Sequence, residues 1–245
     1  MRLTCVDRRP LPTNIYYRGN MGSKNAKWEI DCAIYDCDGV LFDSLDANRR
    51  LYNHICAAMA RDPLTDAELA FCHMHTVFEC LHHLFRDDAE QEARASQFLK
   101  GVNLSDFIEY LKMEPHVFEI LDALRARGIA TAISTNRTTT MKPIMERFDL
   151  WPHFDMVVSA LDVEKPKPDR ESVEKILAQL KIERTRTLYV GDSEIDRQTA
   201  RSAGVLFVAY KHTPLSGEPD ASIDDHLALL DLLSDGARPE GPSSP

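Results

Sequence analysis

The chain has 245 residues, of which 44% are hydrophobic and 28% charged, and its formal net charge is −10 at pH 7. This length and hydrophobic content allow one large α/β domain, or a core domain with a smaller insert. The negative field repels polyanions, so we expect neither a nucleic-acid nor an anionic membrane partner. A small anionic substrate stays compatible with this charge, because a local metal ion or lysine can outweigh the global field.

The N-terminal segment is polar, and Arg8, Arg9 and Pro10 interrupt any apolar run, which is unlike a secretory signal. The six cysteines show no framework spacing and indicate reduced thiols, so we expect a cytoplasmic protein. Residues 1–28 lack periodicity and are interpreted as an extension, with Met21 as an alternative start. At the other end, the Pro-, Gly- and Ser-rich residues 237–245 are expected to form a disordered tail.

Between these ends, apolar runs and helical repeats alternate. One helical repeat begins at Val117 and ends near Gly128, which is placed to cap it, and another ends at Gly204. A third helix is expected to begin after Asp169 as its N-cap. This alternation predicts an α/β fold with a parallel sheet covered on both faces. In chain order, the runs predict strands at 32–35, 129–133, 156–158, 187–190 and 205–209.

One block, from Leu45 to about Pro115, contains several helical patterns and no convincing strand. Residues 65–68 form a capping box that opens one of these helices. Because ligands bind beyond the carboxyl ends of parallel strands, a helical insert directly after the first strand is expected to act as a lid. Further helices are expected at 77–85, 90–99 and 105–111.

An acidic loop, Asp36-Cys37-Asp38-Gly39, follows the first predicted strand. Two carboxylates one residue apart can divide the work, with one attacking or binding metal and the other transferring protons. Gly39 allows the backbone to turn sharply away. The alternative interpretation is an ordinary acidic turn, whose aspartates satisfy loop backbone groups.

Three more predicted strand ends carry groups suited to a phosphate or a metal. The hydroxyl of Thr135 and the N–H groups after it can donate to phosphate oxygens. Lys165 lies in a loop that two prolines stiffen, so its charge can be held in place. Asp192 and Asp196 follow the strand at 187–190. Taken singly, Thr135 and Asp192 could be helix caps and Lys165 a solvated surface residue.

Together, in this order and each at the end of a predicted strand, the four segments resemble motifs one to four of the haloacid dehalogenase-like (HAD) hydrolases. The most similar subgroup contains phosphoglycolate phosphatases and β-phosphoglucomutases, which carry an α-helical cap between motifs one and two. The long interval from Asp36 to Thr135 accommodates such a cap. The short interval from Thr135 to Lys165 excludes the larger α/β cap that some relatives carry after motif two.

The resemblance implies a Rossmann-like core formed by residues 29–44 and 117–236, with an all-α cap formed by residues 45–116. It implies that Asp36 attacks phosphorus, and that Asp38 protonates the leaving alkoxide and then deprotonates the hydrolytic water. It also implies that Mg²⁺ (magnesium) is held by the Asp36 carboxylate, the Asp38 backbone carbonyl and the Asp192 carboxylate.

The remaining site residues follow from the same resemblance. Thr135, the backbone N–H of Asn136 and Lys165 are expected to hold the phosphoryl oxygens. Asp196 is expected to support the water shell of the metal or Lys165. Arg137 directly follows motif two and is therefore the best candidate for a further substrate contact.

These roles imply a Mg²⁺-dependent phosphatase that hydrolyses a small phosphomonoester through an aspartyl phosphate. A divalent ion offsets the repulsion between carboxylate and phosphate, and oxygen ligands suit Mg²⁺ better than Zn²⁺. A sugar-phosphate mutase is the main alternative, since a sugar hydroxyl can replace water in the second step. The presence of Asp38 disfavours a dehalogenase. A non-catalytic binding protein is also disfavoured, because each position that the proposed chemistry uses is filled, including Asp36 and Asp38.

The segment Cys72-His73-Met74-His75 suggests a zinc site at first sight, but its spacing matches no defensible ligand pattern. A better hypothesis is that one or two of the histidines in this region line the cap face over the active site.

Overall fold

The computed structural model of the protein describes residues 16–17, 27–211 and 215–234. The predicted tail at 237–245 and most of the predicted N-terminal extension lie outside these residues. Two described parts of the extension contribute to the sheet region. Residues Tyr16–Tyr17 form β1, and Trp28 makes an isolated bridge to Leu233.

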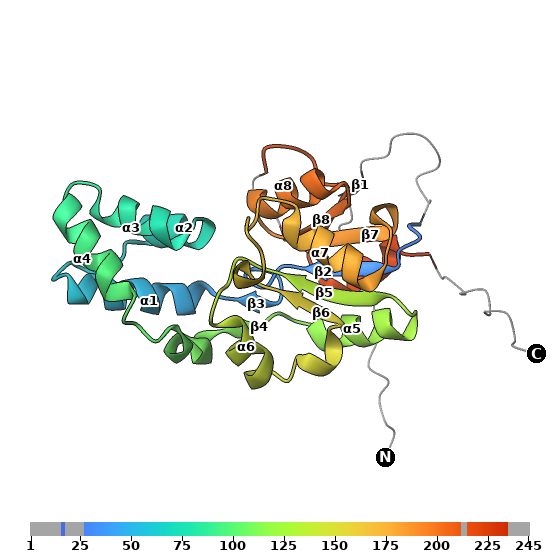
Figure 1. Ribbon diagram of the computed structural model, residues 1–245, viewed down its shortest axis with the longest axis horizontal. Coiled ribbons are helices and arrows are strands. Elements are labelled where there is room, and N and C mark those ends of the chain that lie inside the picture. The colour runs from blue at the N-terminus through green and yellow to red at the C-terminus, as the bar shows by residue number, and fades with distance from the viewer. Residues whose placement is uncertain (1–15, 18–26, 212–214, 235–245) are drawn as a thin grey trace, which may run out of the picture.

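The architecture is a seven-stranded sheet in the order β1-β9-β8-β7-β2-β5-β6 (Figure 1). All neighbouring strands are parallel except β1 and β9, which are antiparallel. The α/β class and the parallel sheet predicted from the sequence are therefore confirmed. The strands after β1 are β2 (Cys32–Tyr35), β5 (Ala130–Ser134), β6 (Met156–Val158), β7 (Thr187–Gly191), β8 (Leu206–Tyr210) and β9 (Ala221–Ile223).

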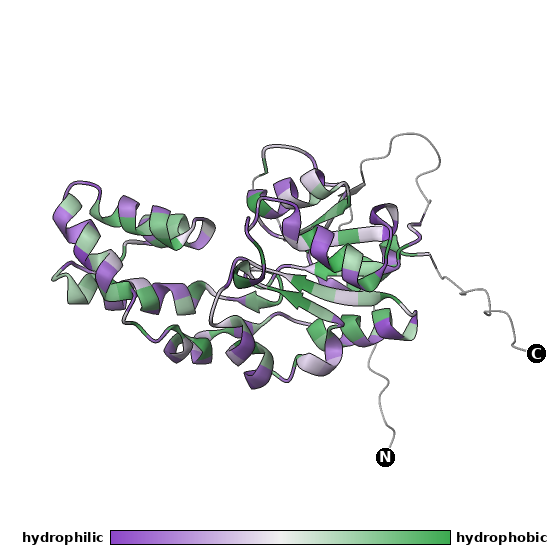
Figure 2. Ribbon diagram, viewed as in Figure 1, coloured by the Kyte–Doolittle hydropathy of each residue, from purple (hydrophilic) through white to green (hydrophobic). Residues whose placement is uncertain are grey.

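Helices cover both faces of this sheet. Successive side chains of a strand point to opposite faces, and β2 shows the result directly. Ala33 and Tyr35 belong to one hydrophobic cluster, while Cys32 and Ile34 belong to another. All four are fully buried, which explains why this strand is continuously apolar (Figure 2).

The first cluster includes buried residues of α5 (Val117–Ala126) and α6 (Met141–Arg147). The second includes buried residues of α7 (Glu171–Leu180) and α8 (Glu194–Ala203). Each pair of helices therefore packs on one face. Short elements complete the core: η2 (Trp151–His153), η3 (Ala160–Asp162), η4 (Arg184–Arg186), η5 (His226–Ala228) and α9 (Leu229–Leu232).

Most predicted helix ends agree with the structure, with one shift. Gly128 and Gly204 both have a left-handed backbone after α5 and α8, as the C-terminal signals predict. The predicted N-cap Asp169 is wrong by one residue, because Arg170 occupies that position of α7. Asp169 still contributes, since its Oδ1 accepts a hydrogen bond from the backbone N–H of Glu171 at 3.0 Å.

The insert is helical and has a packed cluster of its own, which includes Tyr52, Ile55 and Leu81. It lies beyond the end of the sheet at which β2 leads into α1 (Figure 1). The capping box at Thr65 and Glu68 is present. The elements of the insert are α1 (Leu45–Ala58), α2 (Asp66–Met74), α3 (Val77–Phe85), α4 (Ala89–Leu99) and η1 (Leu104–Tyr110), the last a 3₁₀ helix.

The two connections between the insert and the core lie side by side. β3 (Phe42–Asp43) and β4 (Lys112–Met113) pair as a two-stranded antiparallel ribbon. The expectation that no strand occurs between Leu45 and Pro115 is therefore wrong for β4. Two residues are too few to produce an alternating pattern in the sequence, and the pairing depends on β3.

No helix among the described residues is long and apolar enough to cross a membrane. The five described cysteines are buried free thiols: Cys32, Cys37, Cys56, Cys72 and Cys80.

Candidate active site

Three neighbouring strands bring the predicted motifs together. β2 pairs in parallel with both β5 and β7, so their carboxyl ends meet at one edge of the sheet. Asp36 follows β2, Thr135 follows β5 and Asp192 follows β7. The convergence that the sequence predicts for these three residues is therefore present.

Two glycines make this close approach possible. Gly39 has a φ of +72°, and a Cβ atom placed on it would lie 1.8 Å from Oδ2 of Asp192. A Cβ on Gly191 would lie 2.3 Å from the Cβ of Asp196. A larger residue at Gly39 would push the loops after β2 and β7 apart, and a larger residue at Gly191 would push the start of α8 away from the end of β7.

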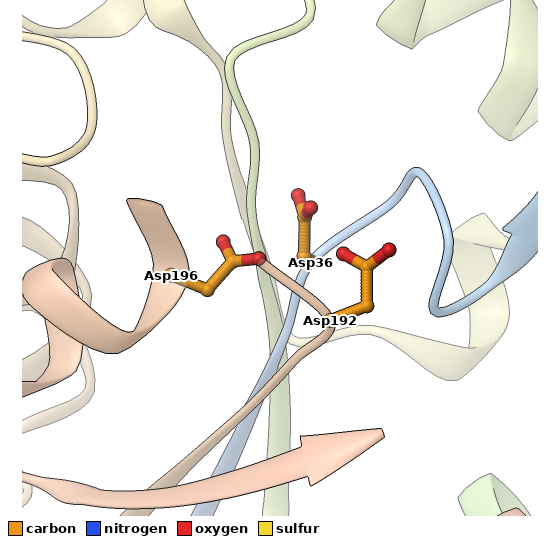
Figure 3. Close-up of side chains that lie close together, drawn as sticks. All are labelled: Asp36, Asp192 and Asp196. Carbon is orange, nitrogen blue, oxygen red and sulfur yellow. The ribbon is translucent and has the colours of Figure 1, made fainter. Parts of the chain in front are cut away.

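Asp36, Asp192 and Asp196 form an acidic cluster, with one carboxylate oxygen from each lying within 4.8 Å of the others. Figure 3 shows the three side chains converging from the ends of β2 and β7 and from α8. Asp36 and Asp196 are buried, and Asp192 is partly buried. Such a concentration of negative charge requires a cation nearby.

The described cation that meets this cluster is Lys167. Its Nζ donates to Oδ1 of Asp36 at 2.8 Å, to Oδ1 of Asp196 at 2.7 Å and to the hydroxyl of Tyr189 at 3.1 Å. The side chain of Lys167 is only 4% exposed. Burial alone would lower the pKa of Lys167, but the charges of Asp196 and Asp36 outweigh burial and hold it well above its usual value. Lys167 is therefore a fixed positive charge.

This finding corrects the prediction for Lys165. Lys165 is exposed, and its backbone N–H donates to Oε2 of Glu171 at 2.8 Å. It lines a separate shallow hollow with Pro166 and Pro168 instead of the cavity above Asp36. The loop thus places the second lysine of its Lys-Pro-Lys-Pro sequence, and not the first, against the carboxylates.

Asn136 explains why the loop takes this position. Its side-chain Oδ1 accepts from the backbone N–H of Lys167 at 3.0 Å, and its Nδ2 donates to the Lys167 carbonyl at 3.0 Å. The amide therefore holds Lys167 by both of its backbone groups. Sequence reasoning assigned Asn136 only a backbone role, so this contact was missed.

Asp196 supports the lysine, as the sequence suggested for Lys165. Its Oδ1 accepts from Lys167, while its Oδ2 accepts from the hydroxyl of Ser193 at 2.6 Å in a capping box of α8. Both oxygens are therefore engaged by protein groups. This leaves Asp36 and Asp192 as the better pair of metal ligands within the cluster.

Asp38 and Arg137 form a bidentate ion pair. Nε of Arg137 donates to Oδ2 of Asp38 at 2.7 Å, and Nη2 donates to Oδ1 at 2.6 Å. Nη1 of Arg137 also donates to the Thr140 hydroxyl at 3.2 Å, and its backbone N–H donates to Thr135 Oγ1 at 3.1 Å. Arg137 thus lies in the site, but its guanidinium holds the second aspartate of the acidic loop.

The pKa values reflect these partners. Burial, and then the charge of Asp196, raises the pKa of Asp36 to about 7, against the opposing effect of Lys167. Burial and the same neighbouring charge raise the pKa of Asp192 to about 8. For Asp38, burial alone would raise the pKa, but the charge and hydrogen bonds of Arg137 outweigh burial and lower it. The cluster therefore favours a bound cation, whereas Asp38 is held as a carboxylate.

A cavity of about 620 Å³ opens above these groups, and its lining includes Asp36, Asp38, Thr135, Lys167 and Asp192. Its opposite wall comes from the helical insert, and His73 and His75 contribute to it. The hypothesis that cap histidines line the site is thereby confirmed for these two residues.

Two further residues were missed at the sequence level. Lys167 carries the same local signal as Lys165, because both precede a proline in one loop. Tyr189 lies inside β7, where an aromatic residue indicates only a buried strand position. Its hydroxyl donates to the carbonyl of Ser134 at 2.9 Å and accepts from Lys167, so it links β7 to β5 beneath the site.

Comparisons with known proteins agree with this geometry. Residues 33–210 match the haloacid dehalogenase-like hydrolase family. A phosphoglycolate phosphatase from Rhodobacter capsulatus is 32% identical over 215 residues, which cover 83% of this chain and 96% of that protein. A putative pyrophosphatase from Caldanaerobacter subterraneus is 39% identical over 131 residues, which cover 51% of this chain and 60% of that protein.

A solved structure from Geobacter sulfurreducens, described as a HAD-superfamily hydrolase of subfamily IA, is also similar. It has a TM-score of 0.73 and 33% sequence identity, with coverage of 87% of this chain and 100% of that chain. Because 87% of this chain is covered, the match includes at least part of the helical insert as well as the core. This chain therefore belongs to the haloacid dehalogenase-like hydrolases and is similar, within them, to the phosphoglycolate phosphatases.

Proposed function

We propose that the protein is a Mg²⁺-dependent phosphatase that hydrolyses a phosphomonoester through an aspartyl phosphate on Asp36. The observation that carries the proposal is the position of Asp36 on the floor of the cavity. Its Oδ1 accepts from Lys167, and its carboxylate lies beside that of Asp192. A carboxylate held between a fixed cation and a candidate metal ligand is suited to attack a phosphoryl group.

The donor set fits magnesium. The candidate ligands are carboxylate oxygens of Asp36 and Asp192, to which the family resemblance adds the backbone carbonyl of Asp38. These are hard oxygen ligands, and the acidic cluster among the described residues consists of aspartates alone, which suits Mg²⁺ better than Zn²⁺. When bound, the ion would offset the negative charges of the phosphate and the carboxylates.

Each of the remaining catalytic roles is assigned to a group of the protein. Asp36 supplies the nucleophilic oxygen, and Lys167 neutralises charge on the phosphoryl oxygens in place of the predicted Lys165. Thr135 and the backbone N–H of Asn136 are proposed to donate to the same oxygens. Asp196 positions Lys167 through the hydrogen bond at 2.7 Å.

Asp38 is proposed as the acid and base. It must donate a proton to the leaving alkoxide and then remove one from water. The ion pair with Arg137 favours the carboxylate form, which suits the second of these steps. For the first step, Arg137 has to release Asp38, and a substrate phosphate is a suitable alternative partner for its guanidinium.

The expected kind of substrate and the expected cellular location also belong to this proposal. The partner is a small-molecule phosphomonoester, and the location is the cytoplasm. The burial of the five described free thiols supports a reducing compartment.

The nucleophile can be tested by Asp36→Asn, with Asp106→Asn on the exposed side of η1 as the matched control. We expect Asp36→Asn to lower kcat by at least about 10⁴-fold, because an amide does not attack phosphorus. Rapid quenching of the wild type with a ³²P-labelled substrate should trap a hydroxylamine-sensitive label that Asp36→Asn lacks. Appreciable turnover by Asp36→Asn, or an equal label in both proteins, would rule out the covalent mechanism.

A further inference from the structure

The wall of the active-site cavity that faces the carboxylates is apolar. The helical insert supplies this wall from α1, α2, α3, α4 and η1, with a few polar groups between the hydrophobic ones. Its apolar members are Ala47, Leu51, Val77, Phe78, Leu99, Leu104, Phe107, Ile108 and Leu111. The leaving group of a phosphate ester bound at Asp36 would therefore contact mainly the apolar side chains of this wall.

Three members of this wall lie outside the hydrophobic clusters of the protein. Leu104, Phe107 and Phe78 belong to none of the hydrophobic clusters that the described residues form. Phe78 is 76% exposed, and the other two are partly buried. Apart from the contact between the rings of Phe107 and His54, whose centroids are 6.1 Å apart, these side chains offer hydrophobic surface to a ligand in the cavity.

The same wall lacks positive charge. The arginines closest in sequence to its α1 members are paired elsewhere on the insert. Arg49 contacts Asp66, and Arg50 contacts Asp46 while its guanidinium lies 3.8 Å from the ring centroid of Tyr110. No Lys or Arg among the described residues of the insert lines the cavity.

The cations that do line the cavity are on the core side and already have partners. Lys167 contacts Asp36 and Asp196, and Arg137 contacts Asp38. The proposed mechanism uses both for the phosphoryl group. A second anionic group on the leaving side of the substrate would therefore be desolvated without a counter-ion, which is costly.

The polar side chains that the insert adds to this wall include two histidines. Nδ1 of His73 lies 3.3 Å from the side-chain amide of Asn48. His75 is stacked on Phe71, and its Nδ1 lies 2.8 Å from the Phe71 carbonyl. Each imidazole therefore already has a partner at one ring nitrogen.

We infer that the substrates are phosphate monoesters of neutral, predominantly apolar alcohols, either alkyl or aryl. This inference rests on the proposed function and specifies its substrate class. It separates the protein from the activities in the names of its relatives, because phosphoglycolate carries a carboxylate on the leaving side and pyrophosphate carries a second phosphate. The cavity volume of about 620 Å³ also leaves room for a group larger than either.

The test measures kcat/KM with Mg²⁺ for propyl phosphate, hexyl phosphate, phosphoglycolate and pyrophosphate. Burying one methylene corresponds to about a fourfold gain, so partial burial of three should favour hexyl over propyl phosphate by on the order of tenfold. Hexyl phosphate should also exceed phosphoglycolate and pyrophosphate by at least about tenfold. Equal or better turnover of phosphoglycolate or pyrophosphate, whose leaving groups are anionic, would overturn the inference while leaving the proposed phosphatase intact. Absence of turnover for all four would instead count against the proposed function.

A variant of the wall provides the second test, with a matched control. Leu104→Arg places a cation opposite the phosphate site, and Trp151→Arg places one at a position that is 49% exposed and outside the cavity. Leu104→Arg should lower kcat/KM for hexyl phosphate and raise it for phosphoglycolate, each by on the order of tenfold, with a similar Tm to wild type. The control should keep the wild-type preference. An unchanged preference in folded Leu104→Arg would show that this wall does not contact the leaving group.

Discussion

Lys167 offers a sharp test of the site, because Lys165 lies two residues away in the same loop and provides a matched control. Replacing Lys167 with Met keeps an unbranched side chain one atom shorter and removes its charge. The substitution leaves Asp36 and Asp196 without the hydrogen bonds of 2.8 Å and 2.7 Å that they now accept. Lys165→Met removes an exposed charge that has no such role.

The size of the effect follows from burial. Lys167 is 4% exposed, Asp36 is 11% exposed and Asp196 is fully buried, so solvent screens these pairs little. Removing one partner of a buried ion pair costs about 3–5 kcal/mol, because the remaining charge stays uncompensated. Protonation of the carboxylates and binding of a cation both reduce this cost. An exposed substitution such as Lys165→Met should change the free energy of unfolding by less than about 0.5 kcal/mol.

The assay combines urea unfolding in EDTA at pH 8 with steady-state kinetics in Mg²⁺. We expect Lys167→Met to lose about 3 kcal/mol of stability in EDTA and to recover part of it in Mg²⁺. Its kcat should fall by at least about 10²-fold, while Lys165→Met stays near wild type. The opposite pattern, with activity lost in Lys165→Met and kept in Lys167→Met, would refute the placement of the loop.

Three further predictions concern pH, the Asp38 pair and the insert. Since the folded pKa of Asp192 is about 8, above the ordinary 3.8, its ionisation should destabilise the metal-free protein increasingly from about pH 4 to pH 8. Unfolding in EDTA should therefore show Asp192→Asn gaining stability over wild type as pH rises from 5 to 8, by about 1 kcal/mol or more, and a constant difference would contradict the pKa shift. Arg137→Met should lower kcat by about 10²-fold for both hexyl phosphate and 4-nitrophenyl phosphate, because both share the water step in which the Asp38 carboxylate acts as the base; a loss for hexyl phosphate alone would contradict this role of the ion pair. Hydrogen exchange with a metal fluoride should protect residues 43–46 and 112–117 and the cap face of the cavity, whereas protection confined to the core loops would show that the insert is a fixed appendage.

The sequence by itself determined the class of the fold and the order of the chemical groups. Continuous apolar runs such as β2 indicate strands buried on both faces, and the helical repeats between them require parallel connections. Because parallel strands end at one edge, the alternation allowed Asp36, Thr135 and Asp192 to meet, and the resemblance to the HAD motifs assigned them to one site. These features depend on local periodicity, which a single sequence displays.

Only the tertiary structure decided which side chains meet. The loop contains Lys165 and Lys167 in the same local context, and no periodicity distinguishes them. The choice depends on the side chain of Asn136, which comes from a different strand end and binds both backbone groups of Lys167.

The same reason applies to the other differences between prediction and structure. The pair between Asp38 and Arg137 joins two loops that are far apart in the chain, and β4 exists because β3 lies beside it. The Tyr189 hydroxyl links β7 to β5 only once those strands are in register with β2. Contacts of this kind are set by distance in space, and neighbouring residues in the sequence carry no signal of them.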